Sequence, residues 1–246
     1  MPQRENTVPI VQGFLQAWSA LMRGVRAGLA RTRILSAWDQ WASRSRVGLW
    51  LRSQLSVWDV EDFVQLDLPW WTLDSASLVD EFLSVRPRAR VFEWGSGAST
   101  IWLEKRATEV ISVEYDPEWT QLMQTIVGPG TTVVEVSASP DPHPEVPSGM
   151  WGHKGLDYSS YVAAIDAARG DFDLIVIDGR ARTACLDKAV ERLAPGGMIV
   201  FDNTNRARYR KALESVAPMF EPTTTSGLTP ALPWSTHTTL LRKTHS

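Results

Sequence analysis

The sequence predicts an α/β fold: a doubly wound, mostly parallel sheet of seven strands with a helical extension at the N-terminus. Two short runs, 174–177 and 198–201, are apolar throughout, as parallel strands covered on both faces should be. Such runs alternate with amphipathic stretches in successive β-α-β units. With 246 residues, 43% of them hydrophobic, the chain can bury the core of one such domain and its extension.

Residues 1–65 form the predicted extension, because apolar side chains recur at three- and four-residue steps from Ile10 to about Trp58. This spacing predicts two or three amphipathic helices. Residues 1–60 hold eight arginines and no lysine against three acidic residues, a net charge of +5. Tryptophan beside arginine suits burial against the domain, and it also suits contact with an anionic membrane surface. We expect residues 10–58 to cover the domain, with a peripheral membrane contact or a homo-oligomer contact as the alternatives.

The predicted α/β domain spans residues 66–246. Asp74 or Ser75 is expected to cap a first short helix, which Pro87 ends. The alternation then predicts strands at 90–93, 110–114, 131–136, 172–178 and 198–202, and helices at 98–106, 117–127, 158–169, 183–193 and 206–217. Residues 139–155, rich in proline and glycine, are expected to form a loop. The last two strands, 220–225 and 236–242, are joined by a loop alone and should pair antiparallel at a sheet edge.

Composition narrows the class of protein. The net charge of -3 gives no reason to expect nucleic acid as a partner. The single cysteine, Cys185, excludes an internal disulfide and suits a reducing compartment. The first ten residues do not read as a secretory signal, and polar residues interrupt the apolar stretch from Ile10 to Ala30, so no membrane span is expected. The expected location is the cytoplasm, with attachment to a membrane surface as the alternative.

A glycine turn follows the first predicted strand of the domain. Gly95 and Gly97 stand between that strand and a helix, where they let the backbone approach a ligand that the helix N-terminus can bind through free N–H groups. A dinucleotide site would have Gly or Ala in place of Thr100. Glu93 would repel a pyrophosphate and favour an ammonium group. The turn is therefore a candidate site for a ligand other than a dinucleotide.

Acidic residues end four of the predicted strands: Glu93, Glu114, Asp178 and Asp202. In a doubly wound sheet, functional residues lie at the carboxyl ends of the strands, where the crevice forms. Glu114 lies 19 residues beyond Gly95, the distance expected of a carboxylate that accepts the hydroxyls of a ribose. The alternative for each acid is an exposed strand end or a helix cap.

Taken together, these motifs resemble the class I S-adenosylmethionine-dependent methyltransferases. The resemblance rests on Glu93-x-Gly95-x-Gly97, Glu114, the run Asp173–Asp178 and the run Leu193–Gly197, and it covers roughly residues 70–246. It implies a Rossmann-like methyltransferase fold whose last strand is antiparallel, and S-adenosylmethionine as cofactor. The residues it implies for the cofactor are Glu93, Trp94, Gly95, Ser96, Gly97, Ser99 and Thr100 for the methionine portion, Glu114 and Tyr115 for the ribose, Ser137 and Ala138 for the adenine, and Asp178.

A closer similarity links Asp178, Asp202 and Asn203 to the cation-dependent O-methyltransferases of the catechol and caffeoyl-coenzyme A type. The resemblance implies that these three residues bind a divalent metal, and oxygen ligands suit Mg²⁺, Mn²⁺ or Ca²⁺. Such a metal would lower the pKa of an acceptor hydroxyl. Those enzymes have a catalytic lysine where this sequence has Ala181, so the general base is not assigned. The alternative is that Asp178 contacts the amino group of the cofactor while Asp202 and Asn203 cap the next helix.

Other side chains are candidates for binding the acceptor or for proton transfer. Arg180 and Arg182 could clamp an acidic substrate, although such arginines are more often solvated or paired locally. His153 and His237 are candidate bases because histidine titrates near neutrality. Trp234 is a candidate wall of an acceptor pocket, as are Trp70, Trp71 and Trp151, and core packing explains any one of them equally well.

The function that the sequence predicts is transfer of the methyl group of S-adenosylmethionine to a hydroxyl oxygen of a small molecule, with a divalent cation as a candidate second cofactor. Direct in-line displacement needs positioning and charge neutralisation, and no covalent enzyme intermediate. Three alternatives stay open: a metal-independent N- or O-methyltransferase with a histidine base, an aminopropyltransferase, and a membrane-surface or partner-binding protein on a degenerate scaffold.

Overall fold

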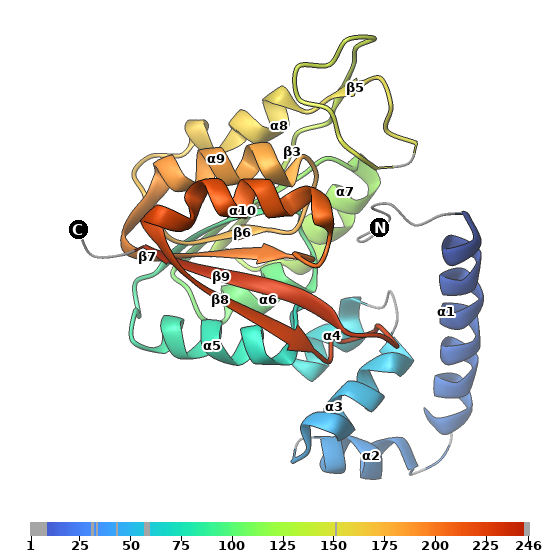
Figure 1. Cartoon of the computed structure of the whole chain (residues 1–246). Coiled ribbons are helices and arrows are strands. Elements are labelled where there is room, and N and C mark those ends of the chain that lie inside the picture. Colours follow the sequence, from blue (N-terminus) through green and yellow to red (C-terminus); the bar gives the residue numbers. More distant parts are fainter. Residues whose placement is uncertain are drawn as a thin grey trace.

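In the computed structural model the chain forms a seven-stranded sheet with helices on both faces (Figure 1). The structure describes residues 9–30, 32, 34–42, 44–56, 60–150 and 152–243. The strands of the sheet are β1 (Arg90–Trp94), β2 (Glu109–Glu114), β3 (Thr131–Glu135), β6 (Phe172–Ile177), β7 (Leu193–Asp202), β8 (Phe220–Gly227) and β9 (Thr236–Lys243). Their order across the sheet is β3-β2-β1-β6-β7-β9-β8.

The pairing of the strands confirms the predicted fold class. Strands β3, β2, β1, β6 and β7 are parallel, whereas β9 pairs antiparallel with both β7 and β8. The last two strands therefore form the expected antiparallel pair, with β8 at the edge. The loop expected over 139–155 differs in one respect, because β4 (Ser139–Pro140) and β5 (Leu156–Asp157) pair across it as a separate two-stranded ribbon.

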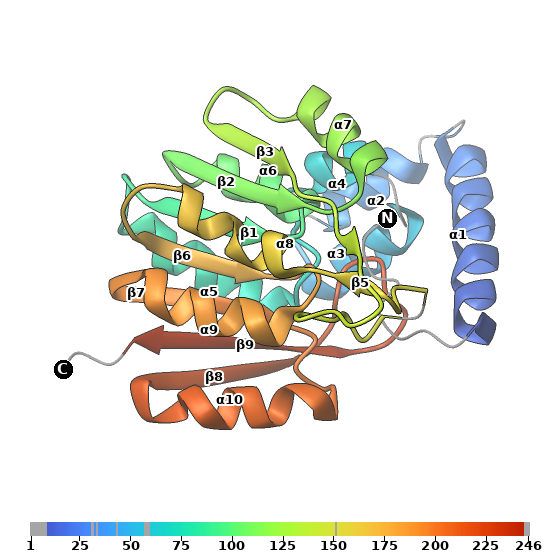
Figure 2. The same cartoon turned by 90° about the horizontal axis from the view of Figure 1, so that it is seen from above.

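Three helices pack on each face of the sheet (Figure 2). Helices α5 (Leu73–Ser84), α6 (Ala98–Glu104) and α7 (Pro117–Ile126) cover one face. The other face carries α8 (Ser159–Ala163), α9 (Arg182–Arg192) and α10 (Arg210–Val216). The central strands are buried on both sides, which explains their uniformly apolar runs.

Two predicted helices are shorter than expected. After α8 the chain continues as a 3₁₀-helix, η2 (Ala164–Ala167), and Arg192 binds the carbonyls of Ile165, Ala168 and Gly170 that a longer helix would have used. The stretch 206–217 is divided into η3 (Ala207–Tyr209), α10 and η4 (Ala217–Met219). Pro218 disfavours the α conformation in the residue before it, which accounts for the end of α10 at Val216.

The N-cap of α5 is Thr72, and neither Asp74 nor Ser75 has that role. The Thr72 hydroxyl accepts a hydrogen bond from the Ser75 N–H at 3.3 Å. Asp74 lies within the first turn and forms an ion pair with Arg46. The helix ends at Ser84, one turn before Pro87.

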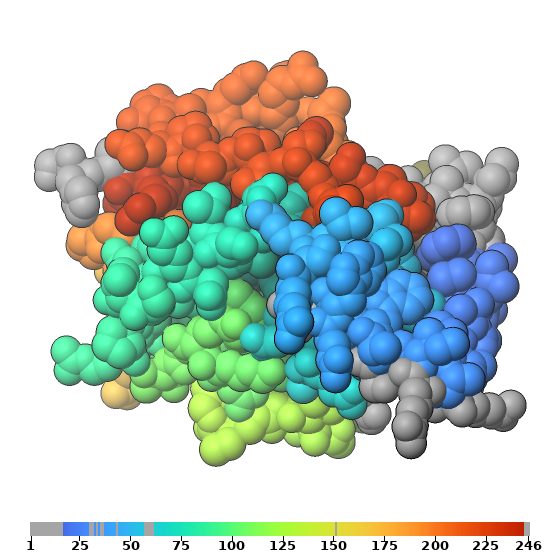
Figure 3. All heavy atoms as spheres, turned by 90° about the horizontal axis from the view of Figure 1, so that it is seen from below, coloured from blue at the N-terminus to red at the C-terminus, as the bar shows by residue number. Residues whose placement is uncertain are grey.

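The extension consists of α1 (Pro9–Ala30), α2 (Ile34–Ala42), α3 (Arg46–Ser53), the 3₁₀-helix η1 (Gln54–Ser56) and α4 (Val60–Leu66). Figures 1 and 2 show α1 at the outer edge of the molecule. Trp18 and Met22 of α1 pack, half-buried, on a cluster that includes Phe63 and Trp70. Figure 3 shows the later helices of the extension against α5 and the residues around the β8–β9 connection.

Several tryptophans of the extension are therefore at least half-buried against the rest of the chain, as expected if the extension covers the domain. Apolar side chains on α1, α2 and α3 are nevertheless exposed: Leu21, Val25, Ile34, Trp41 and Val47. Contact of these residues with a membrane surface or a second copy of the chain stays a prediction. Among the described residues, none of the helices is both long and apolar enough to span a bilayer.

Candidate functional site

A crevice opens at the carboxyl edge of the sheet between β1 and β6. The strand order reverses there, because β2 and β3 lie to one side of β1 and the later strands lie to the other. A narrow cavity, with about 20 Å³ of free space, occupies this position. Its lining consists of Trp70, Gly95, Ser96, Gly97, Ser99, Glu114, Tyr115, Asp178, Gly179 and Arg180.

The glycine turn lies at the floor of this cavity, and its two glycines are required for different reasons. Gly95 has a φ of 98°, and a Cβ there would lie 2.7 Å from the backbone nitrogen of Gly179. The turns after β1 and β6 can therefore pack against each other. A Cβ on Gly97 would lie 2.9 Å from the indole ring of Trp70, which covers the turn. Close packing within the protein thus explains why both positions are glycine, and no ligand is needed to account for them.

Glu114 presents a buried carboxylate to the cavity at the end of β2. One oxygen accepts hydrogen bonds from the Tyr115 and Asp116 N–H groups at 2.8 and 3.2 Å. The other accepts from the N–H and the hydroxyl of Ser96 at 3.1 and 3.2 Å. Burial raises the pKa of Glu114 above its ordinary value, although these backbone donors and Arg180 lower it. Three of its four donors are backbone amides, so the carboxylate has a fixed position.

Glu93 is fully buried and does not line the cavity. Its oxygens accept hydrogen bonds from the hydroxyls of Ser99 and Thr100, each at 2.5 Å, and of Ser112 at 2.8 Å. Burial raises the pKa of Glu93 to about 7 despite these donors. The expected contact of Glu93 with a ligand ammonium group is therefore replaced by a structural role, in which the carboxyl group holds the start of α6 against β2.

Seven of the residues expected at the cofactor line the cavity: Gly95, Ser96, Gly97, Ser99, Glu114, Tyr115 and Asp178. The others lie outside it for identifiable reasons. Trp94 is a core side chain whose Nε1 donates to the Tyr161 carbonyl at 3.0 Å. Thr100 faces Glu93. Ser137 donates to the Tyr115 carbonyl at 3.3 Å, and Ala138 packs against the core on the α8–α10 face.

Arg180 and Tyr115 form one wall of the cavity. The guanidinium lies 4.4 Å from the centre of the Tyr115 ring and donates to its hydroxyl at 2.5 Å. Burial raises the pKa of the Tyr115 hydroxyl, although Arg180 opposes this. Arg180 is thus a buried wall residue of the cavity; of the two alternatives given for it, a solvated or a locally paired arginine, the solvated one is wrong.

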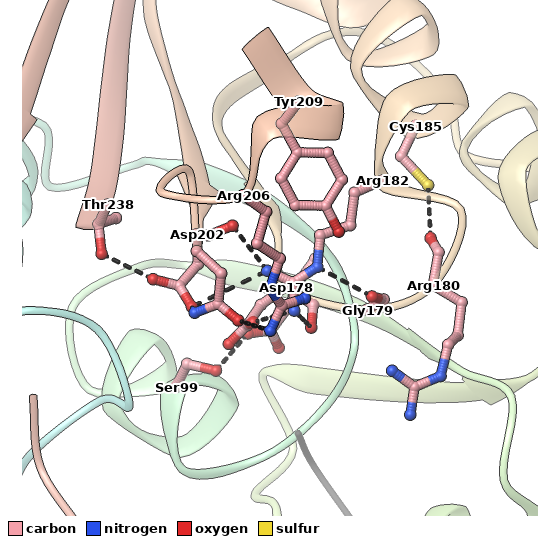
Figure 4. A network of polar contacts seen from close by, with 12 residues as sticks. Ser99, Asp178, Gly179, Arg180, Arg182, Cys185, Asp202, Arg206, Tyr209 and Thr238 are labelled. Carbon is pink, nitrogen blue, oxygen red and sulfur yellow. Dashed lines mark hydrogen bonds and ion pairs between the residues drawn. The ribbon is translucent and has the colours of Figure 1, made fainter. Parts of the chain in front are cut away.

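Arg182 lies between the ends of β6 and β7 (Figure 4). Its guanidinium donates to the Asp178 carboxylate at 2.7 Å and lies 3.8 Å from the Asp202 carboxylate. It also donates to the carbonyls of Asp178, Gly179 and Asp202 at 2.8, 3.0 and 2.7 Å. The side chain is 1% exposed, so it cannot clamp a substrate from solvent. Arg180, by contrast, points away from this cluster.

The proposed metal ligands are occupied by protein donors. Asn203 donates to Asp202 and accepts from Arg206 at 2.7 Å, while the Thr238 hydroxyl donates to Asp202 at 2.7 Å. A divalent cation needs several oxygen ligands around one point. Here the guanidinium of Arg182 lies between the two carboxylates, so the three residues as arranged do not fit such a cation. Among the described residues, no group of three or more His, Cys, Asp and Glu side chains is arranged to hold a metal ion.

The helix-capping alternative for Asp202 and Asn203 is also wrong. The helical segment after β7 is η3, whose N-cap is Arg206, with no side-chain cap hydrogen bond. Asn203 has a left-handed backbone, with a φ of 58°, and its side chain turns back onto Asp202. Burial raises the pKa of Asp202, and Arg182 and the Thr238 hydroxyl lower it.

Comparison with solved structures agrees with the topology of the sheet. An O-methyltransferase from Bacillus cereus in complex with SAH is 17% identical, with a TM-score of 0.54 over 75% of this chain and 90% of the other. The O-methyltransferase TomG from Streptomyces achromogenes, involved in tomaymycin synthesis and in complex with SAM, is 16% identical, with a TM-score of 0.51 over 76% and 87%.

The chain has the class I methyltransferase fold. No family model matches the sequence, and the comparison with curated proteins finds no match. The similarity at this level of identity establishes the architecture of the sheet and its flanking helices. Which reaction the methyltransferase fold of this chain supports has to be argued from its own residues.

The two candidate histidines lie in different places in this methyltransferase fold. His153 contacts the Tyr158 hydroxyl through Nδ1, and its ring lies 5.5 Å from that of Tyr115, at the cavity wall. His237 lies on β9 and is half-buried, and its carbonyl accepts from the Thr204 N–H at 2.9 Å.

The candidate tryptophans also lie in different places. Trp70 covers the glycine turn, Trp71 is a core residue, and Trp234 is exposed. Trp151 lies outside the described residues. Of the three described here, Trp70 lines the cavity, and Trp71 and Trp234 do not.

Four residues of the site were not expected from the sequence: Ser112, Gly179, Arg206 and Thr238. Gly179 follows Asp178 directly, so a sharp turn at that strand end was a signal that could have found it. Thr238 contacts Asp202 because β9 is in register with β7, and its pairing partner there is Asp202 itself. Register between distant strands leaves no local pattern in the sequence, and neither do the contacts of Ser112 and Arg206.

A second cleft of about 280 Å³ lies beside the turn after β6. It runs between the start of α9, η3 and the loop around residues 145–149. Its lining is mixed in charge: Glu145, Val146, Pro147, Ser148, Gly149, Ala181, Arg182, Thr183, Ala184, Asp187, Arg208 and Tyr209. The turn 178–182 separates it from the first cavity.

Proposed function

We propose that the protein is an S-adenosylmethionine-dependent methyltransferase that methylates a hydroxyl oxygen of a small molecule. The observation that carries this proposal is the cavity at the strand-order reversal, where the glycine turn, Glu114 and Asp178 meet on three neighbouring strands. In open α/β sheets ligands bind at the carboxyl ends of the strands where the strand order reverses, which supports the assignment.

The residues of the cavity have the chemistry that this cofactor requires. Glu114 is held by three backbone amides, and a ribose hydroxyl would replace the Ser96 hydroxyl, the only side-chain donor among its four. Glu114 and Asp178 supply negative charge, which favours the positive sulfonium and ammonium groups of S-adenosylmethionine. Trp70 covers Gly97 and shields this side of the cavity from water.

The cofactor would supply an electrophilic methyl group, and the role of this chain is to position the acceptor for direct displacement. The cleft beside the turn 178–182 is the proposed acceptor side, because it adjoins the cavity and carries hydroxyl, acidic and basic groups. An oxygen acceptor is supported by the two solved structures above, both named as O-methyltransferases. Transfer of a labelled methyl group to a panel of alcohols, phenols and amines tests the acceptor atom.

Binding of S-adenosylhomocysteine tests the cofactor assignment directly. At about 100 times its Kd the compound should stabilise the folded chain by roughly 2.7 kcal/mol, which a thermal melt detects. Glu114→Ala should reduce this shift strongly. Glu135→Ala is the matched control, because Glu135 is an exposed acid at the end of β3 outside the cavity. If the wild-type melt does not respond to the compound, the proposal is wrong.

A further inference from the structure

Arg182 is bound by the protein as a metal ion would be, through a ring of oxygen atoms. Four hydrogen bonds of 3.0 Å or less join its guanidinium to oxygens of Asp178, Gly179 and Asp202. Its planar fork of five donors matches acceptors that approach from several directions. All these acceptors belong to the carboxyl ends of β6 and β7, so one side chain joins two adjacent strand ends.

The charges of the cluster require a cation at this point. Asp202 is 0% exposed and Asp178 nearly buried, and two such carboxylates in a low-dielectric site repel each other. Arg182 lies between them, and Arg206 adds a second positive charge at Asn203. Removal of Arg182 would take away the cation that lies between the two carboxylates, while Arg206 keeps a positive charge near Asp202.

The backbone on both sides is shaped to bring these groups together. Ala181, just before Arg182, has a left-handed conformation with a φ of 48°, which is unfavourable for a residue with a Cβ. Asn203, just after Asp202, has a φ of 58°. Strained residues of this kind persist where the surrounding contacts over-determine the local structure, and they concentrate at functional sites. Here the Arg182 guanidinium donates to carbonyls of the turn after β6 and to the Asp202 carbonyl at the end of β7.

We propose that Arg182 is a built-in cation that takes the place of a divalent metal between Asp178, Asp202 and Asn203. Two consequences follow. The wild-type protein does not bind a divalent cation at these residues, and truncation of Arg182 converts them into a divalent-cation site. Arg182 would also act in the proposed methyl transfer, as a positioning residue that holds the Asp178 carboxylate at the cavity. This last role alone rests on the proposed function.

Mn²⁺ binding, measured from the loss of the free-ion signal in electron paramagnetic resonance, tests the proposal on the full chain. Wild type should leave the signal unchanged. Arg182→Ala should bind about one Mn²⁺ per chain, because it leaves space and removes the cation that lies between the two carboxylates. Its melting temperature should rise with added Mn²⁺, and that of the wild type should not. Arg182→Gln provides a second test, since it removes the charge but keeps a longer polar side chain that supports the fold.

Three further variants distinguish Mn²⁺ binding at the cluster from a general effect of charge on Mn²⁺ binding. Arg182→Lys keeps the positive charge and should not bind Mn²⁺. Arg180→Ala removes a cation from the same loop that does not join the cluster, and it should not bind Mn²⁺ either. Asp202→Asn in the Arg182→Ala background should abolish the binding.

Mn²⁺ binding by the wild type that Asp202→Asn removes would overturn the proposal. So would the absence of binding in both neutral Arg182 variants, provided that their melting curves show them to be folded. These outcomes are distinct from failure of the proposed function, because the melt with S-adenosylhomocysteine reports the cofactor cavity and the Mn²⁺ signal reports the cluster.

Discussion

Glu93 carries a buried carboxyl group whose three partners are hydroxyls of α6 and β2. Its pKa is raised from 4.5 to about 7 because burial disfavours the charged form. The folded protein therefore binds this proton more tightly than the unfolded chain does. The stabilisation from the protonated form is complete below pH 4.5 and is lost as pH rises through about 7.

Glu93→Gln should remove this loss, because the amide imitates the protonated acid at every pH. We expect the free energy of unfolding of the variant, relative to wild type, to rise by about 3 kcal/mol between pH 4.5 and pH 8 in urea titrations. Glu118→Gln, an exposed position on α7, is the control, and its difference from wild type should stay the same. A Glu93→Gln difference that does not change with pH would show that the carboxyl group titrates normally.

At the scale of single residues, the sequence predicted which positions carry the chemistry better than it predicted the directions of the side chains. Glu93, Glu114, Asp178 and Asp202 do end neighbouring strands, because a buried strand and an acidic terminus are local features. Whether the carboxylate faces the cavity depends on partners from other elements. Glu93 turns inward because its carboxyl group accepts hydrogen bonds from Ser112 of the neighbouring strand and from two hydroxyls of α6. The spacing of residues in the sequence does not predict these contacts.

The start of α5 is fixed by a tertiary contact as well as by a local cap. The Thr72 hydroxyl accepts from the Ser75 N–H and lies 2.5 Å from the hydroxyl of Thr225 on β8. Thr72→Ala should therefore lower the free energy of unfolding by about 1 kcal/mol or slightly more, as measured in urea. The matched variant is Asp74→Ala, which removes only an exposed ion pair with Arg46 and should cost less than about 1 kcal/mol. A larger effect of Asp74→Ala would favour the cap expected from the sequence.

Elements were predictable from the sequence where a pattern is long and local. The apolar runs and the turns between them locate all seven strands, and β9 pairs as expected because its connection to β8 is short. The two-residue strands β4 and β5 are too short to leave a pattern, and they pair across fifteen residues of loop. The cap of α5 was misplaced by two or three residues, because three polar residues there can each cap a helix, and the Thr225 hydroxyl contacts those of both Thr72 and Ser75.

The whole molecule is held together by buried charges as well as by its core. Asp62 of α4 contacts Arg52 of α3 at 2.8 Å, Arg26 of α1 at 3.0 Å and the hydroxyl of Ser56 in η1. Arg52 in turn binds Asp39 of α2 at 2.6 Å. All five elements of the extension meet at this network.

The same extension is hydrogen-bonded to the connection between β8 and β9. Ser53 accepts from the Ala231 N–H at 3.1 Å, and Trp50 donates to the Leu232 carbonyl at 3.0 Å. The extension therefore folds against the sheet domain through specific contacts, beside the tryptophan that covers the glycine turn. We infer that loss of the network at Asp62 loosens α1 to α4 first and leaves the central strands intact.

Asp62→Asn tests this inference. Asp62 is 1% exposed, and burial alone would raise its pKa, but the hydrogen bonds and charges of Arg52, Ser56 and Arg26 hold the pKa below its ordinary value. Its stabilising contribution is thus present above about pH 3.8 and lost at lower pH. Breaking the pair leaves the buried Arg52 without its buried acidic partner, at a cost of about 3–5 kcal/mol. Hydrogen exchange should show this loss in α1, α3 and α4 before it appears in β1 and β6.

The control for Asp62→Asn is Asp80→Asn, which removes an exposed partner of Arg106 and should cost no more than about 1 kcal/mol. If Asp62→Asn instead accelerates exchange equally in the extension and in the central strands, the two parts unfold as one cooperative unit. The extension would then be an integral part of the domain that carries the cavity. A change confined to α1, α3 and α4 would mean that these helices can open while the part of the cavity formed by Glu114 and Asp178 keeps its shape, because both residues belong to the sheet and its turns.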